Sequence, residues 1–226
     1  MNSNPYYDKK KQQYYDGLNP YLLKKINGSW KTALDVGCGA GNLGAALENR
    51  GITVYGIEAF PEAAQKAETK LSHVLCGDIE SAVLPYNAEQ FDCILFGDVL
   101  EHLVDPWSVL KKLRPYLKKD GTVLACVPNV GHISVVLELL AGKWTYRDAG
   151  LMDQTHLRFF TREELISLFK AGGYEMKSIE AIRVDHPSYQ QAISSLHEVC
   201  VKLGIRHDFL AEASAYQYVI EAERSL

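Results

Sequence analysis

The sequence is poor in the features that mark several classes of protein. Its five cysteines form no Cys-x-x-Cys pair, so they are expected to be small buried thiols. No apolar run approaches the roughly 20 residues of a membrane-spanning helix, and the net charge of −4 gives no general attraction to nucleic-acid phosphates. Together with a polar N-terminus that lacks a secretory pattern, these absences favour a cytoplasmic protein without membrane or nucleic-acid partners.

Short strand-like segments alternate with amphipathic helical ones along the chain. Strands are expected over 33–36, 52–58, 73–76, 91–96, 122–127, 174–184 and 215–223. Alternation of this kind predicts an α/β fold with a doubly wound sheet and helices on both faces. Ligands of such sheets bind beyond the carboxyl ends of the strands, so the residues at those ends are candidates for a site.

Helix boundaries are marked as clearly as the strands. Asp105 and Pro106 form an N-cap and first-turn pair, and the helix that they begin should break or kink near Pro115. The segment 161–164 reads Thr-Arg-Glu-Glu, which is a capping box. Between the last two strands, apolar residues spaced over 192–203 predict one amphipathic helix.

The first expected strand runs into a glycine-rich turn that follows Asp35. Gly37, Gly39 and Gly41 can adopt positive φ angles, and they let a ligand lie against backbone N–H groups. Many α/β proteins need such glycines only to turn the chain. The turn therefore indicates a ligand site only if the neighbouring strand ends supply matching polar groups.

The next three strands do end in such groups. Glu58 could accept two hydrogen bonds from ribose hydroxyls. Asp78 could accept from an adenine amino group while Ile79 packs on the ring, and Gly97 with Asp98 follows the fourth strand. The joint pattern indicates a ligand that contains adenosine.

The segments ALDVGCGAG (33–41), VYGIE (54–58), CGDIE (76–80) and FDCILFGDVLEHL (91–103) resemble the successive motifs of class I S-adenosylmethionine-dependent methyltransferases. They are most similar to the small-molecule branch that includes ubiquinone-biosynthesis-type enzymes (methyltransferase types 11 and 12). The resemblance covers about residues 30–175. It implies a Rossmann-like, seven-stranded sheet with an antiparallel C-terminal strand, and S-adenosylmethionine as the cofactor.

The resemblance also implies where the cofactor lies. The glycine turn would approach its methionine part, Glu58 its ribose, and Asp78 with Ile79 its adenine. The full set of implied cofactor residues is Asp35, Gly37, Gly39, Gly41, Glu58, Asp78, Ile79, Gly97 and Asp98. One methyltransferase domain would span residues 1–226, with 1–28 as an N-terminal helical lid or tail. Residues 129–160 and 185–214 would be insertions that form or cover the acceptor side.

Other functions use the same residues. Residues 39–44 also match Gly-x-Gly-x-x-Gly, and Glu58 stands at the spacing of a dinucleotide-binding fingerprint, so a nicotinamide-dependent oxidoreductase is an alternative. Asp35 and the motifs after the third and fourth strands have no role in that alternative. A scaffold that binds the cofactor without catalysis, and a methyltransferase for nucleic acid or protein, are further alternatives. The segment Gly97 to Leu100 lacks the Asn/Asp-Pro-Pro-aromatic motif of enzymes that methylate base amino groups.

His102 is the candidate catalytic residue, because an imidazole with a pKa near 6.5 suits proton transfer at neutral pH. It could deprotonate a hydroxyl or amine acceptor, or it could simply cap the turn before Asp105. No metal is expected. The spacing of His132, Asp153 and His156 matches no standard metal site, and displacement from a sulfonium needs none.

The acceptor of the methyl group is expected to be a small molecule bound by irregular segments. The candidates there are polar and aromatic: Tyr14, Tyr15, Asn129, His132, Trp144, Tyr146, Asp153, His156 and Arg158. A similar Asp-x-Thr-His-x-Arg-Phe stretch occurs in bacterial methyltransferases associated with saccharide pathways, although this loop could instead be tied down by its own salt bridges. The N-terminal tyrosines could belong to a lid or to a solvated tail. The helix near 186–204 could cover the acceptor or form a homodimer surface, and the oligomeric state is left open.

Overall fold

The structure is a computed structural model that describes residue 10 and residues 17–184 and 186–225. It confirms a seven-stranded sheet with the strand order β3-β2-β1-β4-β5-β7-β6. The strands are β1 (Thr32–Val36), β2 (Thr53–Glu58), β3 (His73–Cys76), β4 (Phe91–Gly97), β5 (Leu117–Pro128), β6 (Tyr174–Arg183) and β7 (Ala215–Arg224). β7 is antiparallel to both of its neighbours, as expected, and the pairs among β1 to β5 are parallel.

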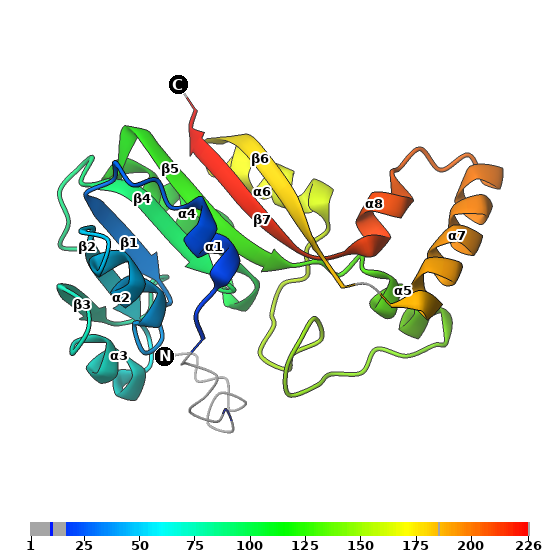
Figure 1. Ribbon diagram of the computed structural model, residues 1–226, viewed down its shortest axis with the longest axis horizontal. Coiled ribbons are helices and arrows are strands. Elements are labelled where there is room, and N and C mark those ends of the chain that lie inside the picture. Colours follow the sequence, from blue (N-terminus) through cyan, green and yellow to red (C-terminus); the bar gives the residue numbers. More distant parts are fainter. Residues whose placement is uncertain (1–9, 11–16, 185, 226) are drawn as a thin grey trace.

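Helices cover both faces of the sheet, so it is doubly wound (Figure 1). α1 (Pro20–Lys25), α2 (Asn42–Glu48) and α3 (Pro61–Ala67) contribute Leu22, Leu47 and Ala67 to the core on one face. α4 (Pro106–Leu113) and α6 (Arg162–Ala171) pack on the other face. None of the helices in the described ranges is both long and apolar enough to span a bilayer.

Local sequence signals set the boundaries of these helices. The Asp105 side chain accepts a hydrogen bond from the Ser108 N–H at the start of α4. Pro115 lies in a single 3-10 turn directly after α4, which confirms the predicted break, because proline cannot supply the N–H that the helix needs. Thr161 accepts from the Glu164 N–H at the start of α6, as expected of a capping box.

A third group of helices stands beyond one end of the sheet (Figure 1). It contains α5 (Ile133–Leu140), α7 (Pro187–Lys202) and α8 (Phe209–Ser214). The helix predicted between the last two strands is therefore present, but a second helix, α8, follows it before β7. Within the described chain α7 contacts α5 and α8 and buries none of its residues, so its apolar spacing does not make it a core helix.

Asp92 ties the amino ends of β1 and β4 together. Its carboxylate accepts hydrogen bonds from the N–H groups of Lys31 and Thr32 and from the Lys118 ammonium group. Burial alone would raise the pKa of Asp92, but these donors outweigh it and lower the pKa to about 2. The carboxylate therefore stabilises the fold above its ordinary pKa of 3.8, and this contribution is lost as the pH falls toward 2.

Asp92→Asn should lower the free energy of unfolding at neutral pH by about 1 kcal/mol, because solvent screens part of the interaction. Urea denaturation at pH 7 and again near pH 3 measures it. The difference between variant and parent should shrink at the lower pH. Asp120→Asn, at an exposed position of β5, is the matched control. A difference that does not depend on pH would contradict this account.

Candidate active site

The glycine turn between β1 and α2 is left-handed at three positions. Gly37, Gly39 and Gly41 have φ angles of 70°, 54° and 78°. A Cβ at residue 37 would lie 2.6 Å from a methyl carbon of Val99, and one at residue 41 would lie 3.0 Å from the Ala67 backbone. The turn therefore needs glycine for its conformation and for the close approach of neighbouring chain.

Glu58, at the end of β2, holds this turn in place. One carboxylate oxygen accepts from the Gly39 N–H at 2.8 Å, and the other accepts from the Phe60 N–H at 2.9 Å. The side chain is buried, and burial raises its pKa although the N–H donors oppose the rise. A carboxylate oxygen can accept more than one hydrogen bond, so Glu58 can bind ligand hydroxyls as well.

Asp35 presents a buried oxygen without a partner in the described chain. Its Oδ2 atom has no hydrogen bond, and the residue is 3% exposed. Burial, with Glu58 as a second cause, raises the pKa of Asp35 to about 7. An orphaned buried oxygen beside a glycine turn fits a site whose ligand brings a positive charge or a donor, as the methionine part of S-adenosylmethionine would.

The other two predicted strand ends lie at the same edge of the sheet. Asp78 follows β3, and its Oδ1 accepts from the Glu80 N–H, while Ile79 is buried. Asp98 follows β4 with a φ of 57°. Gly97 ends β4, which pairs with β1 and β5, so it lies beside the glycine turn. The topology thus gathers all four strand ends, as expected.

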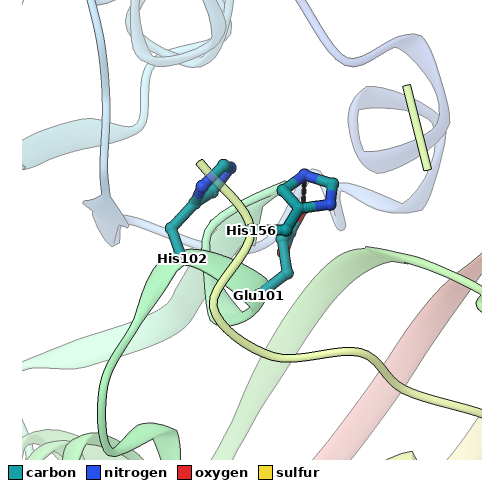
Figure 2. A group of neighbouring side chains, drawn as sticks. All are labelled: Glu101, His102 and His156. Carbon is teal, nitrogen blue, oxygen red and sulfur yellow. Dashed lines mark ion pairs between the residues drawn. The ribbon is translucent and has the colours of Figure 1, made fainter. Parts of the chain in front are cut away.

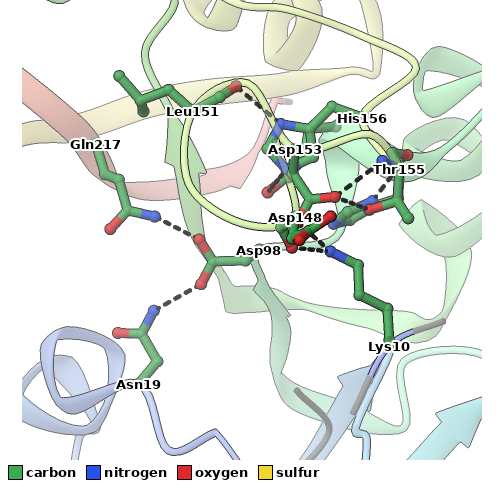
Figure 3. A network of polar contacts seen from close by, with 11 residues as sticks. Lys10, Asn19, Asp98, Asp148, Leu151, Asp153, Thr155, His156 and Gln217 are labelled. Carbon is green, nitrogen blue, oxygen red and sulfur yellow. Dashed lines mark hydrogen bonds and ion pairs between the residues drawn. The ribbon is translucent and has the colours of Figure 1, made fainter. Parts of the chain in front are cut away.

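Asp98 also connects distant parts of the chain (Figure 3). Its carboxylate accepts hydrogen bonds from the side-chain amides of Asn19, 3.2 Å away, and Gln217, 2.5 Å away. Burial raises the pKa of Asp98 to about 6, against the effect of these two donors. Asn19 precedes α1 and Gln217 lies near the start of β7, so the segment before the first helix and the last strand meet at this carboxylate.

A cavity of about 190 Å³ lies next to Asp98. Its wall includes four polar residues that were predicted as site residues from the sequence. The other lining residues were not predicted. The lining residues are Asp98, Glu101, His102, Pro128, Ala149, Gly150, Leu151, Asp153, His156, Tyr216 and Gln217. The cavity therefore joins the methionine end of the predicted cofactor site to part of the predicted acceptor side.

His102 and His156 stand together at this cavity (Figure 2). Their ring centroids are 4.8 Å apart. Burial, helped by His156, lowers the pKa of His102 to about 4, and burial also lowers the pKa of His156. Both rings are therefore neutral at pH 7. Glu101 lies beside them, and burial together with the charge of Asp98 holds its pKa well above the ordinary value.

The loop that carries His156 is held by internal hydrogen bonds and by Lys10. Asp153 accepts from the N–H and the hydroxyl of Thr155, and Lys10 donates to Asp153 and to the Asp148 carbonyl, each at 2.5 Å (Figure 3). The alternative was a loop held by its own salt bridges, whereas the ion pair of Asp153 is made with Lys10, which lies outside the loop. Lys10 also brings part of the predicted lid or tail to the acceptor side.

A second cavity, of about 220 Å³, borders the first. His132 lines it, and the two cavities share Ala149, Gly150, Leu151 and Tyr216. The Nδ1 atom of His132 accepts from the Ser134 N–H as a helix cap, and its buried Nε2 atom has no partner in the described chain. His132 thus presents a polar atom to the second cavity.

Four other predicted acceptor residues, all within the described part of the chain, do not line either cavity. Asn129 is buried, and its side chain bonds to the backbone of Glu212, Ala215 and Gly131. Arg158 donates to the Val104 carbonyl. Trp144 and Tyr146 are exposed; the Trp144 ring meets Phe159 edge to face and the Tyr146 ring is tilted against it. Tyr14 and Tyr15 fall outside the described residues.

Some residues of the site were not predicted from the sequence. Glu101 stands directly before His102, and its place in the motif after the fourth strand was the one available signal. Lys10, Asn19 and Gln217 belong to segments with no recognisable site pattern, and only the folded chain brings them here.

A family profile described as a methyltransferase domain matches residues 7–179. The chain belongs to this methyltransferase family. It is an S-adenosylmethionine-dependent enzyme, and the orphaned oxygen of Asp35 together with the glycine turn fits that cofactor. The family match gives no support to a nicotinamide-dependent oxidoreductase.

Curated relatives of this methyltransferase include two named ubiquinone biosynthesis O-methyltransferases. The protein from Coxiella burnetii is 27% identical over 180 residues, which are 75% of this chain and 76% of the relative. That from Actinobacillus pleuropneumoniae is 36% identical over 144 residues, or 58% of this chain and 62% of the relative.

Solved structures show the same fold at low sequence identity. An S-adenosylmethionine-dependent methyltransferase from Archaeoglobus fulgidus matches with a TM-score of 0.64 at 17% identity and covers 96% of both chains. A structure from Thermotoga maritima, described as a possible histamine N-methyltransferase, matches with a TM-score of 0.63 at 20% identity. It covers 91% of this chain and 87% of its own. These structures support the Rossmann-like architecture of the methyltransferase.

Proposed function

We propose that this methyltransferase transfers the methyl group to a hydroxyl oxygen of a small polar molecule, such as a saccharide. The cavity of about 190 Å³ beside Asp98 carries this proposal, because its imidazole, carboxylate and amide groups suit a compact polar acceptor. The names of the curated relatives, which are O-methyltransferases, favour oxygen over nitrogen or carbon. The net charge of −4 favours a small molecule over nucleic acid.

S-adenosylmethionine supplies an electrophilic methyl group when it is bound. The protein's own contribution is to hold the two reactants in line, which can account for much of the rate. The glycine turn and Glu58 would bind the ribose and methionine parts, and Asp78 with Ile79 would bind the adenine. Asp98, fixed by Asn19 and Gln217, would mark the boundary between cofactor and acceptor.

In this proposal His102 assists loss of the acceptor proton. It follows β4 and lines the acceptor cavity, and its neutral imidazole is the form that can accept a proton or bind an electrophile. Its Nδ1 atom lies 3.1 Å from the Thr155 carbonyl oxygen, so Nδ1 carries the hydrogen and Nε2 carries the lone pair. The acceptor hydroxyl would approach on the Nε2 side.

The second cavity extends the acceptor site beyond the reacting group. It shares Tyr216 and the 149–151 segment with the first, so an acceptor could place its hydroxyl near His102 and the rest of its structure near His132. The buried Nε2 atom of His132 would donate to an oxygen of that remote part. This arrangement favours an acceptor that carries several oxygen atoms.

A panel of acceptors tests the chemistry. Purified enzyme would be incubated with S-adenosylmethionine and simple sugars, glycosides, catechols or aliphatic amines, and the products identified by mass spectrometry and NMR. We expect methyl ethers from a hydroxyl-bearing compound. Exclusive formation of methylamines, or turnover only with a protein or nucleic acid, would overturn the proposal.

His102→Ala should reduce kcat by about 10²- to 10⁴-fold with the best acceptor of that panel. Cofactor affinity, measured by calorimetry, should stay within about twofold, because His102 is assigned to the acceptor side. His73→Ala is the matched control. His73 is exposed and is the first residue of β3, so it lies at the amino end of the strands, away from the site at their carboxyl ends. Full turnover by His102→Ala would leave the histidine only a structural role in the turn before Asp105.

A further inference from the structure

Glu101, His102 and His156 converge at one wall of the acceptor cavity (Figure 2). Glu101 and His102 come from the 3-10 turn after β4, and His156 comes from the loop between α5 and α6. One ligand atom from each residue, either a ring nitrogen or a carboxylate oxygen, lies within 4.8 Å of the others. Neighbouring ligands of one small cation stand roughly 3 Å apart, so modest side-chain rotation would close the group around an ion.

The two histidines are oriented as metal-binding histidines usually are. Nδ1 of His102 lies 3.1 Å from the Thr155 carbonyl, and Nδ1 of His156 lies 3.1 Å from the Leu151 carbonyl. A carbonyl can only accept, so each Nδ1 carries the ring hydrogen and each Nε2 carries a lone pair. Metal-binding histidines typically donate their second ring N–H to a backbone carbonyl in this way, which fixes both tautomer and orientation.

Glu101 supplies the observation that requires a partner. It is 1% exposed, and neither carboxylate oxygen accepts a hydrogen bond from the described part of the chain. The His156 Nε2 atom lies 4.0 Å from its Oε1 atom. A buried carboxylate without hydrogen bonds is costly, and it must either keep its proton or bind a cation.

We propose that Glu101, His102 and His156 bind a divalent transition-metal cation, such as Mn²⁺ or Zn²⁺, which takes the acceptor hydroxyl as a further ligand. Two imidazoles and one carboxylate on one side of an ion leave its remaining positions open to the cavity. The expectation of no metal was based on His132, Asp153 and His156. The folded chain brings together a different set.

With the cation bound, His102 would promote deprotonation through the ion and not as a base, because its Nε2 lone pair would be a ligand. A hydroxyl bound to a divalent cation loses its proton at a lower pH, as water bound to Zn²⁺ does. The proton would leave to solvent, the acceptor oxygen would bond to the methyl carbon, and the carbon–sulfur bond would break with its electron pair returning to sulfur. His102 then acts as a ligand that positions the cation. This catalytic part rests on the proposed function, whereas metal binding itself does not.

Metal binding can be measured without any acceptor. Full-length enzyme would be dialysed against a chelator and titrated with Mn²⁺, with free Mn²⁺ followed by electron paramagnetic resonance and with Zn²⁺ titrations followed by calorimetry. We expect one ion per chain. Glu101→Gln and His156→Gln should each weaken binding by at least about tenfold, and His73→Gln, an exposed histidine outside the group, should not change it.

The same samples separate the alternatives. S-adenosylmethionine titrations and thermal melts identify any variant that fails to fold. If either Glu101→Gln or His156→Gln fails to fold, metal binding by the other variant tests the site. No binding of either ion by the parent enzyme, or equal binding by parent and both folded variants, would overturn the metal site. Stoichiometric binding with hydroxyl methylation that is lost on chelation and restored by the ion would support both proposals. Binding that is lost in the variants, with no hydroxyl methylation, would keep the metal site and refute the acceptor class.

Discussion

Gly37→Ala should nearly abolish binding of S-adenosylmethionine and destabilise the fold by about 2–4 kcal/mol. The residue has a φ of 70°, which costs an L-residue about 1–2 kcal/mol. Its new Cβ would also meet Val99 at 2.6 Å, and such overpacking costs about 1–3 kcal/mol. Relief by a backbone shift would move the turn that is proposed to bind the cofactor. Calorimetric titration with S-adenosylmethionine and urea denaturation measure the two effects.

Gly51→Ala separates backbone strain from the close approach. Gly51 has a φ of 79°, but a Cβ there would meet nothing within 4 Å. It should therefore lose only about 1 kcal/mol of stability and keep its cofactor affinity. Val99→Ala in the Gly37→Ala background should recover part of the lost stability. If Gly37→Ala and Gly51→Ala behave alike, the contact with Val99 is not what makes glycine necessary.

Glu58→Ala should weaken S-adenosylmethionine binding by roughly 100-fold or more, because hydrogen bonds to a charged acceptor contribute about 1.5–3 kcal/mol each. The variant removes the acceptor of the Gly39 and Phe60 N–H groups, and with it the expected partner of the ribose hydroxyls. The glycine turn would then lose both its anchor and its ligand contact. Affinity is measured with S-adenosylhomocysteine as well, since the product carries the same ribose.

Glu58→Gln should fall between the parent and Glu58→Ala, since one amide oxygen can still accept while the amide nitrogen cannot. Glu62→Ala, at an exposed position in the first turn of α3, controls for loss of a nearby negative charge. A cofactor affinity that Glu58→Ala leaves unchanged would remove Glu58 from the cofactor site. It would also question the roles assigned to Asp78 and Asp98 by the same resemblance.

Local sequence signals predicted helix boundaries well where the residues that fix the boundary lie within one short segment. Pro115 ends α4, and Thr161 caps α6, because a missing N–H and a side-chain oxygen act within one turn of the chain. The helix α7 shows where such signals mislead. Its apolar spacing predicted an amphipathic helix correctly, but the spacing could not show that the helix packs on α5 and α8 and buries none of its described residues.

The acceptor side was predicted less completely than the cofactor side. His102, Asp153 and His156 do line the cavity beside Asp98. Asn129 instead bonds to the backbone near β7, and Trp144 packs on Phe159. In irregular segments the direction of a side chain depends on tertiary contacts, which the spacing of residues in the sequence does not predict.

The sequence by itself determined the sheet and the cofactor motifs. Asp35 and Glu58 lie at the carboxyl ends of β1 and β2, and Asp78 and Asp98 follow β3 and β4. Parallel strands joined by helices must bring their carboxyl ends to the same side of the sheet. Only the tertiary structure decided that His156 meets Glu101 and His102, and that Gln217 meets Asp98. Those contacts join residues of different elements across a loop or an antiparallel strand, whose paths depend on packing throughout the molecule rather than on any local pattern.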